Sequence, residues 1–386
     1  MTDPGPGAPD GAPRLTMFEL ARLEEARRRA AEVDVAVRES ARAPQAVRRP
    51  SWVLVAALMV VAGAAVLRLY GPMTDVVGER RYAQEIGEGA EVERAAPAFD
   101  ASHPGYGKSG GVLVRVAMPG QLVEYPVTVQ TDPAHLAYQW VRASDSSQAD
   151  AQRPLGGTTV VAPAQPGLYH LSIVSRGGLA TDRRVLSELT LAVLVPFDQK
   201  VGGTLNGYRI GSYPFERFGG EHPLGFIEID QRTTDVAITR HLHLGDFVTH
   251  DEQQAQWPKY AAVSPRLLDK LELVVAEVGR LGFARDPKRI SVDVHSGFRT
   301  PLHNRGVEGA ALNSRHQYGD AADVAIDVDG DGRFTALDSR LVAIAAEMVE
   351  RRNPELVGGL GVYISPKYRT PYVHIDARGK KARWWG

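Results

Sequence analysis

The chain has no cysteine among its 386 residues. It therefore has no disulfide, no thiol nucleophile and no cysteine ligand for a metal, and it lacks the acylated cysteine of a lipoprotein anchor. An excess of charge of one sign is also absent, because 45 Lys and Arg residues are balanced by 46 Asp and Glu residues. The balance gives no reason to expect strong attraction to nucleic acid, and we predict no nucleic-acid partner.

Long apolar runs are rare, and residues 52–67 form a prominent one, with sixteen consecutive uncharged residues. This length is near the lower limit for a helix that crosses a membrane. Arg42, Arg48 and Arg49 lie just before the run, so the positive-inside rule predicts a cytoplasmic N-terminus. We predict one transmembrane helix over residues 51–71, with all later residues outside the cytoplasmic membrane. A buried core helix is the alternative.

The segments on either side of this run predict little compact structure. Residues 1–50 begin with a Pro- and Gly-rich stretch and continue with many Glu and Arg residues. This predicts a partly disordered cytoplasmic segment with one helix, which is either solvated or bound to a partner protein. Residues 72–108 mix charges with Ala, Pro and Gly, a composition typical of a linker.

Residues 109–197 consist of short alternating apolar runs separated by turn residues. This pattern predicts an all-β sandwich. Trp140 and the stretch around Tyr169 resemble the strand tryptophan and the tyrosine corner of immunoglobulin-like domains, here without a disulfide. We expect a spacer or docking module, and binding of glycan or of an envelope protein is the alternative.

Residues 198–386 predict an α+β domain with a central antiparallel sheet. Ser264 and Pro265 are typical of a helix start and Gly282 of a helix end. After this helix the sequence alternates as expected for strands, with one more helix before the last strands.

Two histidines and one aspartate in this domain are of the residue types that bind zinc. His316, Asp323 and His374 would leave a fourth tetrahedral position open, as catalytic zinc requires. Their spacing alone also fits histidines with a purely structural role.

The residues around them make the metal interpretation more specific. The motifs are SGFR at 296–299, SRHQYGDAAD at 314–323 and HID at 374–376. In this order they resemble the zinc D-alanyl-D-alanine metallopeptidases, which include the vancomycin-resistance carboxypeptidases and the murein endopeptidases. The resemblance covers roughly the last 120 residues.

The resemblance implies a role for each matching residue. His316, Asp323 and His374 would be the zinc ligands. Arg299 would bind the substrate carboxylate or a nearby carbonyl, for which a planar guanidinium is well suited, and Ser314 would also contact the substrate.

The general base is the point at which the chain departs from the family pattern. Family members often have Glu or His two or three residues before the last ligand, where this chain has Pro371 and Tyr372. We therefore consider Tyr372 for oxyanion stabilisation and His295 for proton transfer. Asp376 is expected to orient His374, with a role as base as the alternative.

A second candidate metal site is the segment DVDGDGRFTALD at 327–338. Asp327, Asp329, Asp331 and Asp338 occupy positions 1, 3, 5 and 12 of a calcium-binding loop. An ordinary acidic turn is the alternative.

The family resemblance implies zinc-dependent hydrolysis of peptidoglycan stem peptides. The predicted transmembrane helix and its orientation add the expectation of a bacterial, single-pass membrane protein with periplasmic C-terminal domains. Either a terminal D-alanine or a crosslink would be cleaved. One alternative is a catalytically silent wall-binding module, which the absence of an evident base at Tyr372 favours. Another is an envelope scaffold in which the sandwich and the cytoplasmic helix have the main role.

Overall fold

The structure is a computed structural model of the chain. It describes residues 21–25, 28, 101–102, 105–157, 159–176, 183–284, 286 and 290–386. The predicted transmembrane helix over 51–71 and most of the predicted cytoplasmic and linker segments lie outside these residues. Within the described part of the chain, no helix is both long enough and apolar enough to cross a membrane.

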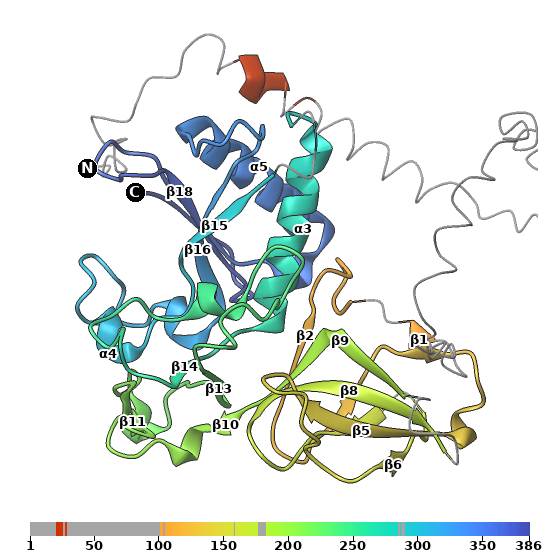
Figure 1. Ribbon diagram of the computed structural model, residues 1–386. Coiled ribbons are helices and arrows are strands. Elements are labelled where there is room, and N and C mark those ends of the chain that lie inside the picture. The colour runs from red at the N-terminus through yellow and green to blue at the C-terminus, as the bar shows by residue number, and fades with distance from the viewer. Residues whose placement is uncertain are drawn as a thin grey trace, which may run out of the picture. The chain divides into compact units, whose positions relative to one another are not determined.

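The region from residue 101 onward is built from β-strands, as the alternating pattern of residues 109–197 predicts, and its first strand lies within the predicted linker 72–108. Its strands are β1 (Ala101–Ser102), β2 (Val114–Ala117), β3 (Leu122–Glu124), β4 (Thr128–Val129), β5 (Leu136–Arg142), β6 (Arg153–Pro154), β7 (Thr159–Val161), β8 (Gly167–Ser175) and β9 (Arg183–Val193). Five of them form a sheet in the order β2-β9-β8-β5-β6, and β3 pairs with β7 (Figure 1).

The core of this β region contains the predicted tryptophan. Trp140 is fully buried, and its indole N–H donates to the carbonyl of Val161 at 2.7 Å. The phenol of Tyr169 donates to the carbonyl of Gln165 at 2.9 Å, which is the local contact of a tyrosine corner. An immunoglobulin-like topology stays a prediction, because β2 and β9 pair in parallel and the strand order alone does not establish it.

A small sheet connects this region with the C-terminal domain. It has the order β10-β13-β14. Its strands are β10 (Val195–Pro196), β13 (Gly225–Ile229) and β14 (Lys259–Ala261), and β11 (Thr204–Leu205) pairs with β12 (Tyr208–Arg209) nearby in sequence.

The C-terminal domain has the predicted sheet flanked by helices. The sheet has the order β15-β16-β18-β17-β19, and all its pairs are antiparallel except β17 with β19. The strands are β15 (Val292–Ser296), β16 (Ala321–Ile326), β17 (Gly359–Tyr363), β18 (Tyr372–Asp376) and β19 (Ala382–Trp385), and the helices are α3 (Pro265–Leu281), α4 (Pro301–Asn304) and α5 (Ala336–Arg352).

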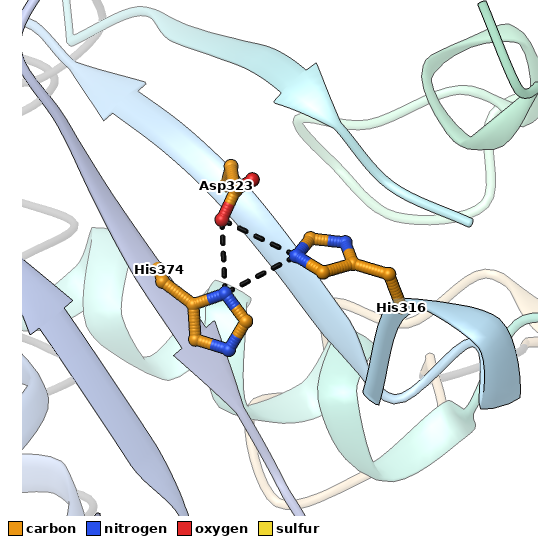
Figure 2. Close-up of side chains that lie close together, drawn as sticks. All are labelled: His316, Asp323 and His374. Carbon is orange, nitrogen blue, oxygen red and sulfur yellow. Dashed lines mark hydrogen bonds and ion pairs between the residues drawn. The ribbon is translucent and has the colours of Figure 1, made fainter. Parts of the chain in front are cut away.

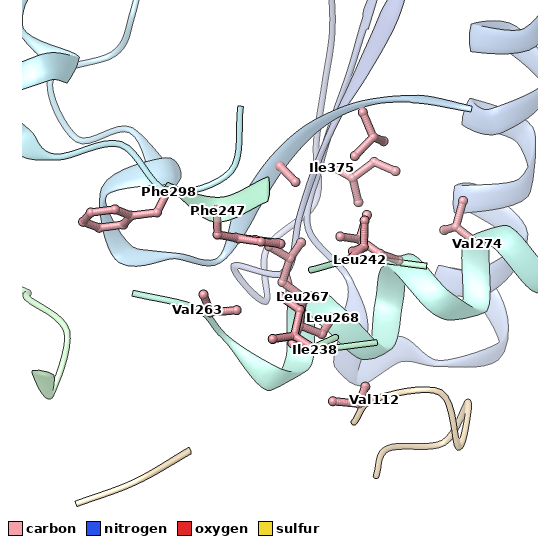
Figure 3. Close-up of a cluster of buried hydrophobic side chains, with 14 of the residues drawn as sticks. Val112, Ile238, Leu242, Phe247, Val263, Leu267, Leu268, Val274, Phe298 and Ile375 are labelled. Atoms are coloured by element: carbon pink, nitrogen blue, oxygen red, sulfur yellow. The ribbon is translucent and has the colours of Figure 1, made fainter. Parts of the chain in front are cut away.

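Helix α3 begins and ends where its sequence predicts. Ser264 is the N-cap residue, although its side chain makes no capping hydrogen bond, and Pro265 is in the first turn. Gly282 ends the helix with φ = 70°, a left-handed conformation that favours glycine. The predicted apolar face is buried, and Leu267, Leu268 and Val274 pack in the core cluster together with Ile375 of β18 (Figure 3).

A buried ion pair joins α3 to α5. Lys270 of α3 is fully buried, and its ammonium donates to Glu350 of α5 at 2.7 Å. The same ammonium donates to the backbone carbonyl of Asp376 at 2.6 Å. The two helices are thus joined to the end of β18, the strand that carries His374.

The described N-terminal residues 21–25 and 28 are helical and contact the C-terminal domain. Leu23 is 6% exposed and belongs to the core cluster. The guanidinium of Arg22 lies 2.9 Å from Asp329 and 4.8 Å from the centroid of the Phe283 ring. This contact favours an arrangement in which the described N-terminal residues and the C-terminal domain lie on the same side of any membrane.

Candidate metal site

Two of the three predicted zinc ligands are neighbours across the sheet. Asp323 on β16 and His374 on β18 are register partners. Because strand residues alternate between faces, the buried Val324 points into the core with the helices and Asp323 points to the opposite face. His316 comes from the 3-10 turn Arg315–Tyr318, just before β16. The three side chains converge on that face of the sheet (Figure 2).

The distances among the three side chains fit a tetrahedral metal. Nε2 of His316 lies 3.1 Å from Nδ1 of His374 and 3.3 Å from Oδ1 of Asp323. Nδ1 of His374 lies 2.9 Å from the same oxygen. Zinc bonds of about 2.0–2.1 Å place neighbouring tetrahedral ligand atoms about 3.3 Å apart. A small shift of His374 would therefore be enough to accommodate the ion.

The second nitrogen of each histidine is already hydrogen-bonded. Nδ1–H of His316 donates to the carbonyl of Gly297 at 2.7 Å, and Nε2–H of His374 donates to Asp376 at 3.2 Å. These partners assign the tautomers, so the nitrogens that face Asp323 carry lone pairs. In these tautomers three acceptor atoms face one another, and a bound cation would satisfy all three.

The protonation states also suit a metal ligand set, and all three side chains are buried. Burial lowers the pKa of His316 and favours its neutral form. Burial alone would raise the pKa of Asp323, but His316 and His374 hold the pKa of that carboxyl well below its usual range. Burial opposes charge on His374 too, but Asp323 and Asp376 outweigh it and raise the pKa of the ring, so a metal would have to displace a proton from His374. A neutral His316 and an ionised Asp323 are the forms that bind a metal.

Asp376 lies directly behind His374. It is fully buried, and its carboxylate accepts the backbone N–H of Gly359 at 2.7 Å. Nε of Arg378 donates to both of its oxygens, at 2.9 and 2.8 Å. Burial would raise the pKa of Asp376, but His374 and Arg378 hold it far below its usual range. An ionised, fixed carboxylate in this position orients the imidazole of His374.

Arg299 contacts the ligand set itself. Its Nη2 donates to Oδ2 of Asp323, the oxygen that does not face the histidines, and its Nε donates to the hydroxyl of Ser296 at 2.7 Å. Its backbone N–H donates to the carbonyl of His316 at 3.2 Å. The residue predicted to bind a substrate carboxylate is therefore bound to a ligand carboxylate.

A β-bulge sets the position of His295. The register of β15 with β16 shifts between Val294 and Ser296, so His295 is the extra residue. Its ring centroid is 5.3 Å from that of Tyr372, and its Nε2 is 3.3 Å from a carboxylate oxygen of Asp293. Its described contacts include no hydrogen bond to the three candidate ligands. His295 thus lies next to the site without touching the ligands.

Tyr372 belongs to a group of tyrosines beside the ligands. It is two residues before His374, on the same face of β18, and stacks on its register partner Tyr363 at 4.5 Å with an interplanar angle of 11°. Tyr368 meets both rings edge-on, at 5.5 and 5.3 Å. Burial and the charge of Asp323 raise the pKa of Tyr372. The phenol therefore stays protonated and is a hydrogen-bond donor, not a base.

Trp384 lies beside His374, although no motif or spacing in the sequence predicted it. Its ring lies 5.1 Å from that of His374, and its indole N–H donates to the phenol of Tyr363 at 2.8 Å. Gly361 makes this approach feasible, because a Cβ there would lie 2.3 Å from the indole nitrogen. Alternation along the strand could have identified Arg378, since it continues the spacing of His374 and Asp376. The contact of Trp384 depends on the pairing of β17 with β19.

Ser314 and the acidic loop complete the predicted site residues. Ser314 is the N-cap residue of the turn that carries His316, and its side chain makes no capping hydrogen bond. In the loop, oxygens of Asp327, Asp329 and Asp338 lie close enough together to hold a cation. Asp331 is not in this group, and its carboxylate accepts the backbone N–H of Arg333 instead.

Asp338 also has a structural role that the loop pattern did not predict. It forms a capping box with Thr335 at the start of α5. Burial and nearby Asp329 raise the pKa of Asp338 to about 6, against hydrogen bonds from Thr335 that lower it. Asp327 accepts the backbone N–H groups of Gly330 and Gly332 at 2.9 and 2.8 Å. The loop is thus also stabilised by bonds that need no cation.

A buried pair of histidines with one carboxylate, in a mixed α/β domain, is the kind of site that holds catalytic zinc in hydrolases. Residues 253–341 match the Peptidase M15 family. The C-terminal region therefore contains a Peptidase M15 domain of the D-Ala-D-Ala carboxypeptidase type, and the resemblance predicted from the sequence is confirmed. The matched residues include Arg299, His316 and Asp323 and end before His374. No curated protein and no solved structure matches the chain.

The family membership of this domain implies peptide hydrolysis, and the family is zinc-dependent. The described His316, Asp323 and His374 are suited to hold the metal.

Proposed function

We propose that the chain hydrolyses peptide bonds in peptidoglycan stem peptides with zinc held by His316, Asp323 and His374. The observation that carries the proposal is the convergence of three acceptor atoms in a domain that matches the Peptidase M15 family. When bound, zinc acts as a Lewis acid on the scissile carbonyl and lowers the pKa of water. The protein orients the ligands through Asp376, Gly297 and Arg299.

Proton transfer is assigned to His295 within this proposal. Its imidazole is beside Tyr372, and Asp293 at 3.3 Å can stabilise the protonated ring. Tyr372, which keeps its proton, would donate a hydrogen bond to the oxyanion that develops on the substrate. The division of roles explains how activity is retained without Glu or His at positions 371 and 372.

The direct test is mass analysis of muropeptides incubated with the purified full-length protein and zinc. Shortened stem peptides or separated crosslinks are expected, and His316→Ala should abolish both the cleavage and the bound zinc. A correctly folded, zinc-loaded protein that cleaves no muropeptide would contradict the enzyme proposal. It would favour the alternative of a silent wall-binding module, which rests on the absence of a carboxylate or imidazole at Pro371 and Tyr372.

For the location, we propose a single-pass protein of the bacterial cytoplasmic membrane, anchored by residues 51–71, with its peptidase domain in the periplasm. The support is the apolar run and the arginines before it. The burial of Leu23 against the C-terminal domain favours the opposite arrangement, with both segments on one side. The two arrangements exclude each other, and labelling of single cysteines from outside the membrane can distinguish them.

The acidic loop is proposed to bind calcium as an auxiliary, stabilising ion. Asp327, Asp329 and Asp338 supply the carboxylate oxygens that this hard cation prefers. The loop begins directly after β16, which carries Asp323, so an ion there would stiffen the end of that strand. The β-rich region before the domain is proposed to be a spacer or a docking module for envelope proteins.

A further inference from the structure

Two of the three guanidinium nitrogens of Arg299 donate hydrogen bonds to other side chains of the protein. Nη2 is bound to Asp323 and Nε to Ser296 at 2.7 Å, and the side chain is only 15% exposed. Because Nη2 holds Oδ2, the carboxylate of Asp323 is turned so that Oδ1 faces the histidines. A substrate carboxylate that sought the guanidinium fork would have to compete with Asp323 for Nη2.

The other arginines that flank the ligands are paired as well. Arg378 donates to Asp376, as described above. Arg315, next to His316 in sequence, donates to Asp320 at 3.0 Å and to Glu221 at 2.9 Å. Neither is free to bind the terminal carboxylate of a peptide without first leaving a carboxylate partner.

The face of β18 beyond His374 is aromatic. Tyr372 and Tyr363 are stacked there, and Tyr368 closes the group. The ammonium of Lys367 lies 4.8 Å from the centroid of the Tyr368 ring. This wall offers apolar surface and hydroxyl donors to a peptide, and its described cation contact, from Lys367, is to Tyr368 and not to a ligand.

From these contacts we infer that the site accepts internal peptide bonds and does not select its substrate through a free carboxylate on the residue after the scissile bond. Arg299 is then a positioning residue for Asp323. The tyrosine wall borders the continuing chain of the substrate. The inference rests on the proposed peptide hydrolysis and narrows it to endopeptidase cleavage.

The test compares two peptides that differ in one group. Both have the sequence diacetyl-L-Lys-D-Ala-D-Ala, one ending in a free acid and the other in a carboxamide. Release of the last residue is followed by mass spectrometry with the zinc-loaded full-length protein. We expect kcat/KM for the amide to equal or exceed that for the acid. If a protein cation bound the terminal carboxylate, kcat/KM would instead be about ten- to a hundredfold higher for the acid. This ratio corresponds to the free energy of one charge-assisted hydrogen bond.

The outcomes separate the two proposals. Cleavage of the acid alone would overturn the internal-bond inference and leave peptide hydrolysis intact. Cleavage of neither peptide, together with intact crosslinked muropeptides, would overturn hydrolysis and the inference with it.

A variant tests the role of Arg299 without relying on activity. Arg299→Gln removes the charge that holds Asp323, so zinc affinity measured by competition with a chelator should fall by about ten- to a hundredfold. The zinc affinity of Arg299→Lys, which keeps the charge but loses the planar guanidinium, should fall less. Arg369→Gln is the matched control, because Arg369 is an exposed arginine between β17 and β18. Unchanged zinc affinity in Arg299→Gln, with KM raised for the acid peptide only, would contradict the positioning role.

Discussion

His374 and Asp376 are two residues apart on β18, and the imidazole Nε2 of the first lies 3.2 Å from the carboxylate of the second. The spacing of two puts both side chains on one face of the strand. The ring is thereby oriented with its other nitrogen toward Asp323, 2.9 Å away. One strand supplies a ligand and the group that orients it.

This pair gives the first prediction. Asp376→Asn keeps the shape of the side chain and removes the charge that stabilises the Nε2–H tautomer of His374. Zinc affinity should fall by about ten- to a hundredfold, measured by chelator competition. Asp293→Asn is the control, because the Asp293 side chain is 57% exposed and does not touch a ligand. Equal zinc affinity in the wild type and Asp376→Asn would mean that the backbone alone orients the ring.

A second prediction concerns pH and calcium at Asp338. Its pKa in the folded protein, about 6, is raised above the usual 3.8. Such a group stabilises the fold below pH 3.8, and this contribution is lost as the pH rises through about 6. In the wild type without calcium, stability should therefore fall as the pH rises from 3.8 to about 6. In Asp338→Asn, which cannot ionise at this position, the fall should be smaller. Melting curves across this pH range, for the variant and the wild type, measure the effect.

Calcium should reverse this trend, because it binds the ionised carboxylates. At a concentration a hundred times its Kd, a ligand specific for the folded state stabilises it by about 2.7 kcal/mol. The rise in Tm with calcium should be larger at pH 7.5 than at pH 5 and absent in Asp329→Asn. Asp331→Asn, outside the three-carboxylate group, should keep the rise. A loop that gives no rise in the wild type at either pH is an acidic turn.

The third prediction addresses the close contact at Gly361. A methyl group there would meet the indole of Trp384 at 2.3 Å, so Gly361→Ala should displace the ring from His374. Overpacking of this kind typically costs about 1–3 kcal/mol. The free energy of unfolding is obtained by denaturant titration, with Gly156→Ala as control, since a Cβ there would meet nothing within 4 Å. Equal destabilisation of both variants would show that Trp384 gives way without cost.

The fourth prediction uses the absence of cysteine, which allows single cysteines to be labelled without background. Under the proposed topology, a membrane-impermeant maleimide added to intact cells with a permeabilised outer membrane labels Lys367→Cys and leaves Asp10→Cys unlabelled. Leu23→Ala then has no effect on Tm. Labelling at both positions would contradict the topology. A loss of about 2–5 kcal/mol in Leu23→Ala would support packing of Leu23 in the core of the C-terminal domain.

Local sequence signals were sufficient to predict the framework of the C-terminal domain. The start of α3 at Pro265 and its end at Gly282 depend on backbone preferences of those residues, which tertiary contacts did not override. Asp323 and His374 were identified through the motifs SRHQYGDAAD and HID and their resemblance to a zinc peptidase family, because their spacing alone also fits a structural role. Such signals are contained in short stretches of chain.

The remaining features depend on register between distant strands. Trp384 reaches His374 only because β19 pairs in parallel with β17 opposite a glycine. The bulge at His295 and the partner of Arg299 likewise follow from how β15 aligns with β16. No periodicity in the sequence fixes such a register, so a role for Arg299 inferred from its motif could not include its contact with Asp323.

The buried Lys270 has a consequence for how the protein acquires its metal. Its ammonium ties α3, α5 and the backbone at Asp376 together within the hydrophobic core, and none of these bonds involves the metal ligands. The frame that presents His374 is thus complete before an ion arrives, unlike a zinc finger, which folds only around its metal. Metal capture should accordingly be a local event with little change in heat capacity. A chelator should remove activity from a chain that remains cooperatively folded.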